Sequence, residues 1–247
     1  MTRVGVIGFG KMAQAIFLPF LETTSENLPL LVVDLNEEVR SAFSQDKGLQ
    51  FMSLEDCVSQ SDILFIAIKP QQSSSLLQTL SPMDFSGKTL VSIMAGVTSD
   101  QITHFFEGGA SVIRLMPNTP ILVKEGLTAI YSGACRHPNH LEFVKDVFKD
   151  QFIELEEESL MHTVTALSGS GPAFFYKIAQ TMVKDGVSQG LSQDLAEQLV
   201  YQTMRGASKM LLKTGKDSQT LIDDVTSPNG TTAAGLAAFD EQSLTWA

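Results

Sequence analysis

A short glycine-containing segment near the start of the sequence has the residue types and spacing to bind a phosphate group. It reads Gly8-Phe9-Gly10-Lys11-Met12-Ala13 and lies between an apolar run, residues 3–7, and a helical pattern over residues 12–21. Gly8 permits a tight turn, Gly10 leaves room for a pyrophosphate, and Ala13 lets the helix pack close to the strand. Free N–H groups at the helix start face such an anion. The order of strand, glycine turn and helix predicts a dinucleotide site; the alternative is a turn that binds nothing.

A carboxylate ends the next predicted strand, residues 29–34. Asp34 lies about 20 residues beyond the glycine segment, where an acidic side chain accepts hydrogen bonds from the ribose of a dinucleotide. A carboxylate there repels a 2′-phosphate and so favours NAD over NADP, although Arg40 follows closely in the sequence. The alternative interpretation is that Asp34 caps the helix predicted to begin near Asn36.

Three further predicted strands end in polar or glycine-containing segments. These segments are Lys69-Pro70, Ala95-Gly96 and Asn118-Thr119, which follow residues 62–68, 88–94 and 112–116. The carboxyl ends of parallel strands meet at one edge of an open α/β sheet, and such folds bind their ligands there. We therefore expect one site along this edge.

Predicted strands and helices alternate through the first 157 residues, and then strand signals stop. This pattern is typical of a doubly wound, mostly parallel sheet. The predicted fold class is α/β, with a dinucleotide-binding domain of Rossmann type over residues 1–157 and an all-helical domain over residues 158–247. Ser168-Gly169-Ser170-Gly171-Pro172-Ala173 predicts a break between two helices, with Ser170 as the cap and Pro172 in the first turn. We expect so small and apolar a helical domain to pack against a second copy of the chain.

The composition disfavours several kinds of partner and location. A formal net charge of −11 argues against nucleic acid and anionic membranes, since both require basic patches. Cys57 and Cys135 are far apart and lack C-x-x-C spacing, which indicates a reducing compartment. Neither a signal peptide nor an apolar stretch of about 18 residues is recognisable. We expect a cytoplasmic protein.

Patterns typical of metal sites are weak. His137 and His140 are three residues apart, but Pro138 lies between them and no further Cys or His is near. We interpret both as part of a solvated loop and expect no metal site. The acidic run Glu154-Leu155-Glu156-Glu157-Glu158 is interpreted as a solvated strand exit and helix start.

Six segments of the chain form a set that covers nearly its whole length. They are Gly8-Phe9-Gly10-Lys11-Met12-Ala13, Ile68-Lys69-Pro70-Gln71, Ser92-Ile93-Met94-Ala95-Gly96-Val97, Arg114-Leu115-Met116-Pro117-Asn118-Thr119-Pro120, Thr165-Ala166-Leu167-Ser168-Gly169-Ser170-Gly171-Pro172-Ala173 and Val225-Thr226-Ser227-Pro228-Asn229-Gly230-Thr231-Thr232. With these segments in this order, the sequence resembles the pyrroline-5-carboxylate reductase family. The first segment is generic, whereas the last two together are specific to the family.

The resemblance implies a Rossmann domain followed by a helical dimerisation domain, in a homodimer or a higher assembly of dimers. It also implies that NADP or NAD, in reduced form, supplies hydride to the C=N carbon of a cyclic imino acid, 1-pyrroline-5-carboxylate, to give L-proline. Ser227, Pro228, Asn229, Gly230 and Thr231 would form the pocket for the substrate carboxylate near the dimer interface, where loop N–H groups suit an anion.

Thr232 matches the family's hydrogen-bond partner of the ring nitrogen. Its hydroxyl is weakly acidic, so we expect it to orient and stabilise a protonated imine rather than to supply the proton. Taken alone, residues 227–232 also predict an ordinary Ser-Pro turn followed by a Thr cap.

Three features depart from the family pattern. Asn229 replaces a second glycine, and asparagine tolerates the positive φ of such a turn. Asp34 stands where NADP-preferring members have small polar or basic residues, which leaves the choice between NADP and NAD open. The sequence ends at Trp246-Ala247, whereas the family continues through a further helix. We expect either a shortened member or a dimer assembled with less helix.

Two other functions stay open from the sequence. One is a related NAD(P)-dependent reductase of another imine or of a 2-oxo acid, for which Lys177 and Lys184 would be candidate catalytic lysines. The other is a nucleotide-binding dimer without catalysis.

Overall fold

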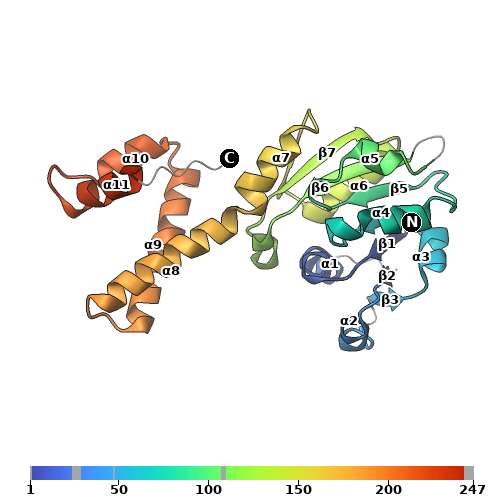
Figure 1. The fold of residues 1–247 in the computed structure, drawn as a ribbon, viewed down its shortest axis with the longest axis horizontal. Coiled ribbons are helices and arrows are strands. Elements are labelled where there is room, and N and C mark those ends of the chain that lie inside the picture. The colour runs from blue at the N-terminus through green and yellow to red at the C-terminus, as the bar shows by residue number, and fades with distance from the viewer. Residues whose placement is uncertain (1, 24–28, 47, 107–109, 242–247) are drawn as a thin grey trace. The chain divides into compact units, whose positions relative to one another are not determined.

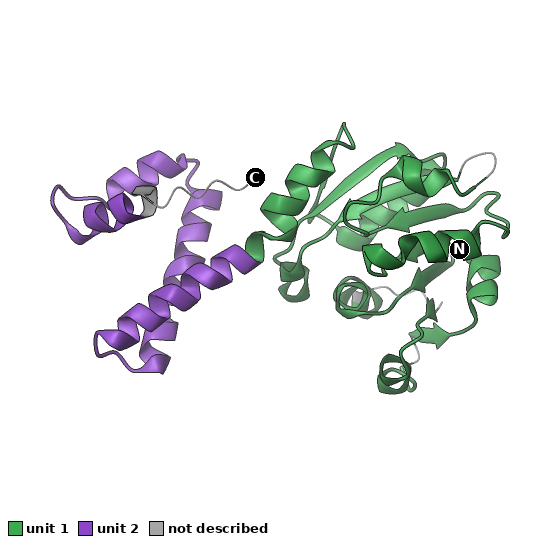
Figure 2. Cartoon of the chain, in the orientation of Figure 1, with its two compact units in different colours: residues 1–172 green, residues 173–247 purple. Residues whose placement is uncertain are grey.

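The computed structural model describes residues 2–23, 29–46, 48–106 and 110–241. The chain divides into two compact units, unit 1 (residues 1–172) and unit 2 (residues 173–247), shown in Figure 2. The segment Trp246-Ala247 lies outside the described residues. In the part of the chain that the structure describes, no helix is both long enough and apolar enough to cross a membrane.

Within the described residues, unit 1 is built on one sheet of eight strands (Figure 1). Across the sheet the strands are β3 (Leu49–Phe51), β2 (Leu30–Val33), β1 (Val4–Ile7), β4 (Ile63–Ile66), β5 (Thr89–Ser92), β6 (Ser111–Met116), β7 (Thr128–Ala134) and β8 (Phe152–Glu154). The first six are parallel, β7 is antiparallel to β6, and β8 is parallel to β7. The order 3-2-1-4-5-6 is that of the doubly wound dinucleotide-binding fold, which confirms the predicted class.

Helices cover both faces of this sheet. α1 (Lys11–Thr23) and α6 (Pro138–Phe148) contribute to the apolar cluster on one face, and α3 (Leu54–Gln60), α4 (Ser73–Leu80) and α5 (Ser99–Thr103) to the cluster on the other. Successive residues of β4 alternate between the two: Phe65 joins the α1 cluster, and Leu64 and Ile66 join the α4 cluster. Burial on both faces explains why these strands are continuous apolar runs.

The predicted helix break near residue 170 is confirmed, because Ser170 belongs to no helix and a long helix restarts at Gly171. A π-helical turn, η3 (Thr165–Gly169), joins α7 (Leu160–Val164) to α8 (Gly171–Ser188), which places Pro172 in the first turn of α8. Ser170 has helical angles, φ −86° and ψ −23°, and its N–H donates to the carbonyl oxygen of Thr165 at 2.8 Å. The wider π turn adds one residue at the end of the first helix, and Ser170 lacks the extended backbone that is typical of a helix cap.

The expectation of a solvated loop at His140 is wrong. This residue lies in the first turn of α6, is only 6% exposed, and places Nδ1 2.8 Å from the hydroxyl of Thr89. The Thr89 hydroxyl in turn donates to Ser111 Oγ at 3.0 Å. Burial lowers the pKa of His140, His137 lowers it further, and Asp62 opposes both. His140 is therefore a buried polar residue whose partner Thr89, at the start of β5, connects it to Ser111 at the start of β6.

Unit 2 is helical throughout its described residues. It contains most of α8, followed by α9 (Gln193–Lys213), α10 (Ser218–Asp224) and α11 (Thr231–Glu241). The buried cluster between α8 and α9 is small: Ala179, Val183, Ala196 and Val200. Large apolar side chains remain exposed along the same two helices, among them Phe175, Tyr176, Met182, Leu195, Leu199, Tyr201, Met210, Leu211 and Leu212. An apolar surface of this extent is typical of an interface.

Candidate cofactor and substrate sites

The glycine turn follows β1 directly and leads into α1. Gly8 has a φ of 87°, and a Cβ there would lie 2.8 Å from the carbonyl oxygen of Ala67, so only glycine fits. A Cβ on Gly10, by contrast, would meet no protein atom within 4 Å. The space beside Gly10 is thus free of protein, and it adjoins the start of α1 at Lys11, whose first N–H groups have no partner within the helix. Met12 is half-buried, and Ala13 is buried against the sheet.

Phe9 holds the glycine turn in place through its buried ring and its backbone hydrogen bonds. Its ring is fully buried and meets Phe43 and Phe51 edge-on, with centroid distances of 5.4 and 6.5 Å. Its N–H donates to the Asp34 carboxylate at 2.6 Å, and its carbonyl accepts the side-chain amide of Gln14 at 2.7 Å. The side chain of Phe9 therefore belongs to the core, and only its backbone lies on the turn.

The Asp34 carboxylate accepts hydrogen bonds from two backbone N–H groups, one in the glycine turn and one just before the next helix. One carboxylate oxygen accepts the N–H of Phe9, and the other accepts the N–H of Asn36 at 2.8 Å. The cap of α2 (Glu37–Ala42) is Asn36, whose side chain accepts the N–H of Glu38 at 2.9 Å. The interpretation of Asp34 as the helix cap is wrong, and its carboxylate lies instead beside the glycine turn.

The ends of β4 and β5 extend the same edge of the sheet. Lys69 is extended and exposed, and Pro70 begins the short helix η1 (Pro70–Gln72). Gly96 has a φ of 75°, and a Cβ on it would meet nothing within 4 Å. Ala95, just before it, is half-buried in the apolar cluster around Met116. Because β1, β4 and β5 are adjacent and parallel, these segments lie at the same edge as the glycine turn.

Asn118, at the end of β6, connects two distant parts of unit 1. Its side-chain oxygen accepts the N–H of Leu127 at 3.1 Å, and its side-chain nitrogen donates to Ser168 Oγ in the π turn at 3.0 Å. The π turn also lies close to Met116, since a Cβ on Gly169 would be 3.5 Å from the Met116 sulfur. Ser168 was missed from the sequence, because helical periodicity does not reveal a π turn. The glycines that follow it, Gly169 and Gly171, were the sequence feature that could have indicated an irregular turn at this position.

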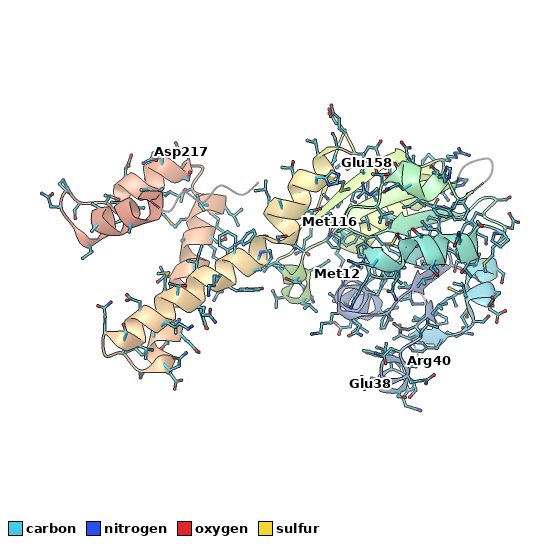
Figure 3. All side chains as sticks on the ribbon, in the orientation of Figure 1. Met12, Glu38, Arg40, Met116, Glu158 and Asp217 are labelled. Carbon is cyan, nitrogen blue, oxygen red and sulfur yellow. The ribbon has the colours of Figure 1, made fainter. Side chains whose placement is uncertain are left out.

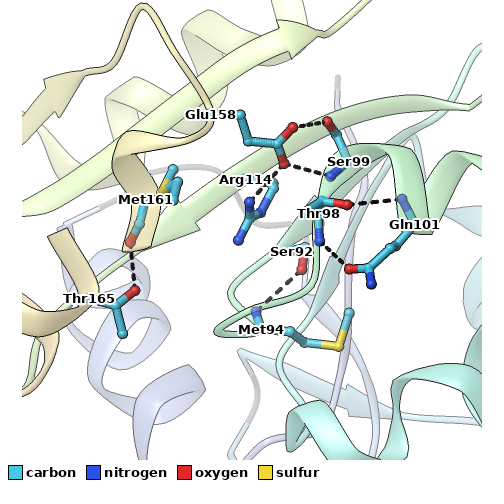
Figure 4. Close-up of polar contacts among 9 residues, drawn as sticks. All are labelled: Ser92, Met94, Thr98, Ser99, Gln101, Arg114, Glu158, Met161 and Thr165. Carbon is cyan, nitrogen blue, oxygen red and sulfur yellow. Dashed lines mark hydrogen bonds and ion pairs between the residues drawn. The ribbon is translucent and has the colours of Figure 1, made fainter. Parts of the chain in front are cut away.

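Glu158 holds the segment after β8 against the sheet (Figure 4). It accepts Arg114 Nη1 at 2.7 Å, the Ser99 N–H at 2.6 Å and the Ser99 hydroxyl at 2.5 Å. Burial raises the pKa of Glu158, but the hydrogen bonds from Ser99 and Arg114 outweigh it and hold the pKa below its usual value. The expectation that the whole acidic run is solvated is wrong at Glu158, because its partner Arg114 is buried in β6 at 3% exposure.

Residues at this edge fit a dinucleotide. The free space beside Gly10 and the start of α1 suit a pyrophosphate, and the Asp34 carboxylate lies one strand away at the end of β2. The boundary between β1 and β4, where the strand order reverses, is where such folds bind nucleotides.

In unit 2, residues 227–230 lie in the turn between α10 and α11, and Thr231 and Thr232 are the first two residues of α11. Asn229 has a φ of 58°, which confirms that asparagine supports the positive φ there. A Cβ on Gly230 would require the Ser227 hydroxyl to move, and the Gly230 N–H donates to the Ser227 carbonyl at 3.0 Å. Ser227 and Pro228 are exposed. Thr231 begins α11 and is exposed, and Thr232 follows it half-buried. The turn thus presents polar groups and a helix start.

Two family models match the chain. Residues 158–247 match the model described as pyrroline-5-carboxylate reductase dimerisation, and residues 3–96 match the model described as NADP oxidoreductase, coenzyme F420-dependent.

Relatives match the chain over nearly its full length. The pyrroline-5-carboxylate reductase of Haemophilus influenzae is 36% identical over 245 residues, which cover 97% of this chain and 89% of that protein. The pyrroline-5-carboxylate reductase of Methanosarcina acetivorans is 35% identical, over 98% of this chain and 91% of that protein. The crystal structure of Plasmodium falciparum pyrroline carboxylate reductase with NADP bound is 29% identical, with a TM-score of 0.85, over 98% of this chain and 90% of that chain. The chain belongs to the pyrroline-5-carboxylate reductase family.

Proposed function

We infer that the protein is a pyrroline-5-carboxylate reductase, which reduces the C=N bond of 1-pyrroline-5-carboxylate to give L-proline in proline biosynthesis. The observation that carries this inference is the identity of 36% over 97% of the chain with a reductase of that name. The glycine turn, the Asp34 carboxylate and the turn before α11 are the structural features that support it.

The carboxyl edge of the sheet would hold NADP or NAD, whose reduced nicotinamide supplies the hydride when bound. Residues 8–13 would bind the pyrophosphate through the backbone and the start of α1. Asp34 would accept hydrogen bonds from the adenosine ribose. Lys69, Pro70, Ala95, Gly96 and Asn118 would line the rest of the cofactor. The two hydrogen bonds of the Asn118 side chain support a role in shaping this edge.

The turn over residues 227–232 would bind the substrate. Backbone N–H groups at the start of α11, together with the Ser227 and Thr231 hydroxyls, would hold the substrate carboxylate. The Thr232 hydroxyl oxygen would hydrogen-bond the ring nitrogen and stabilise its protonated form, which makes the adjacent carbon a better hydride acceptor.

The proposal includes a homodimer, with domains over residues 1–157 and 158–247. The exposed apolar side chains of α8 and α9 support a second copy as the partner, and the dimerisation model begins at residue 158. A higher assembly of dimers stays part of the prediction. We also propose a cytoplasmic location, which is supported by the free thiols of Cys57 and Cys135.

Steady-state kinetics test the proposed activity. The full chain is mixed with 1-pyrroline-5-carboxylate and either NADH or NADPH, the loss of nicotinamide absorbance is followed, and proline is measured as the product. We expect substrate-dependent oxidation of at least one cofactor with stoichiometric proline. Cofactor binding without oxidation of either nucleotide would overturn the proposal and favour a nucleotide-binding dimer.

A further inference from the structure

We propose that Asp34 and the segment after it select NADH over NADPH in this chain. The inference rests on the proposed function for its cofactor class, and it concerns the end of β2, where the two cofactors differ by one phosphate on the adenosine ribose.

The Asp34 carboxylate is fixed in position by the backbone. Its two oxygens accept the Phe9 N–H at 2.6 Å and the Asn36 N–H at 2.8 Å, from the glycine turn and from the residue before α2. An ionised carboxylate has about four acceptor positions, so two backbone bonds leave room for hydroxyl donors. A ribose with both hydroxyls free supplies such donors. A 2′-phosphate supplies negative charge and acceptors instead, and it would repel the fixed carboxylate.

Two backbone N–H groups near the end of β2 already have acceptors, and two side chains close by carry negative charge. At the start of α2, the Asn36 N–H donates to Asp34 and the Glu38 N–H donates to Asn36. Glu37 and Glu38 occupy the first turn of the helix.

Arg40 is the cation of α2, and Figure 3 labels it together with Glu38. Its Nη1 forms an exposed ion pair with Glu37 Oε1 at 3.3 Å, so a 2′-phosphate would compete with that carboxylate for Arg40. Residues 34–40 therefore carry three carboxylates, those of Asp34, Glu37 and Glu38, and one guanidinium, so the segment has a net negative charge. Lys11 is the first residue of α1, at the helix end assigned above to the pyrophosphate.

Direct binding tests the preference without requiring turnover. Calorimetry of the full chain measures the dissociation constants of NADH, NADPH, 5′-AMP and adenosine 2′,5′-bisphosphate. A charge-assisted hydrogen bond contributes enough that we expect NADH to bind about tenfold or more tightly than NADPH. The same order is expected for 5′-AMP over the bisphosphate, since these fragments report on the ribose end alone. Equal or tighter binding of NADPH would overturn the inference and would leave the proposed reductase activity standing.

A variant locates the preference at Asp34. Asp34→Asn removes the charge and keeps one acceptor oxygen, so the ratio of NADPH to NADH affinity is expected to rise about tenfold. Glu55→Gln, at an exposed position in the first turn of α3, removes the same charge elsewhere and is expected to leave the ratio unchanged. An unchanged ratio in Asp34→Asn, or an equal shift in Glu55→Gln, would remove Asp34 as the determinant. The wild-type measurement decides the preference even if the variant folds poorly. Preferential NADH binding without proline formation would uphold this inference and contradict the proposed function.

Discussion

The glycine turn of unit 1 and the turn before α11 in unit 2, the two proposed binding segments, are built in contrasting ways. The glycine turn is held by buried groups of its own unit: the Phe9 ring lies in the core, and Asp34 accepts two backbone N–H groups. The turn over residues 227–232 is mostly exposed and lies in a unit whose buried cluster between α8 and α9 has four residues. Unit 1 can therefore fix this turn with its own core, whereas unit 2 buries little apolar surface of its own between α8 and α9.

This difference separates two kinds of mutational effect. Substitutions in the glycine turn and its surroundings should lower either the stability of unit 1 or its affinity for the cofactor. The packing around each residue indicates which of the two properties is affected. Changes in unit 2 should act through the substrate or through assembly, with little effect on the stability of unit 1.

The largest expected effect is on turnover, from Thr232→Ala. Loss of the hydroxyl that is proposed to stabilise the protonated ring nitrogen should lower kcat by roughly 10²–10⁴. Thr232→Ser keeps a hydroxyl and should retain most of the activity. Steady-state kinetics with saturating cofactor measure both. If Thr232→Ala turns over at the wild-type rate, this residue has no part in the chemistry.

The second effect concerns assembly. Leu199 is 51% exposed on α9, and Leu199→Glu would bury a charge if this surface contacts a second copy. We expect the dimer dissociation constant to rise by about a hundredfold or more, with activity falling as dimer is lost. Sedimentation velocity across a range of concentrations measures it. Ile153→Glu, at a 42% exposed position in unit 1, is the matched control and should leave the dimer intact. A fully active monomer of Leu199→Glu would contradict the expected loss of activity with loss of the dimer.

The third effect distinguishes the two glycines of the turn. Gly8→Ala should destabilise unit 1 by about 1–3 kcal/mol, because alanine at a φ of 87° is strained and its Cβ approaches the Ala67 carbonyl. Gly10→Ala should leave stability unchanged, since its Cβ would occupy free space, but should weaken cofactor binding by about tenfold. Urea unfolding and calorimetry separate the two outcomes. Tight cofactor binding by Gly10→Ala would show that the free space is not the pyrophosphate site.

The smallest effect is on stability and its pH dependence, from Glu158→Gln. The variant weakens the bonds to Arg114 and Ser99 and should cost about 1–2 kcal/mol near neutral pH. Since folding lowers the pKa of Glu158, the stabilisation is fully present above the unfolded value of about 4.3 and is lost as the pH falls through the folded value. The stability difference between wild type and variant should therefore shrink in acid.

Urea titrations at neutral pH and below pH ~4 measure this difference. Glu156→Gln, two residues earlier in the acidic run and exposed, is the control and should behave as the wild type. A stability difference that is constant across the whole pH range would contradict the charge pairing at Glu158.

The fold and the glycine turn could be predicted because their signals are local. Apolar runs of strand length and the spacing of Gly8, Gly10 and Ala13 depend on neighbouring residues. Burial of His140 and pairing of Glu158 could not be predicted in this way, because Thr89 and Arg114, their partners, come from strands about 50 and 44 residues away.

The π turn shows a different limit of the sequence. Gly169 and Gly171 flank Ser170, and glycines of this kind usually mark the end of a helix. The first helix does end here, but through a π turn, because the Ser170 N–H donates five residues back to the Thr165 carbonyl and the Asn118 side chain donates to Ser168 from another element. Neither contact can be predicted from the helical spacing of apolar residues in the sequence.

The buried ring of Phe9 has a consequence for how a nucleotide is received. Since Phe43 and Phe51 clamp this ring in the core, the glycine turn loses its conformational freedom when the chain folds, before any ligand arrives. Association then needs no ordering of the loop, so its entropy should be less unfavourable than for a mobile turn. A substitution at Phe51, which packs edge-on against this ring, should accordingly slow nucleotide binding although Phe51 is not among the residues proposed to contact the nucleotide.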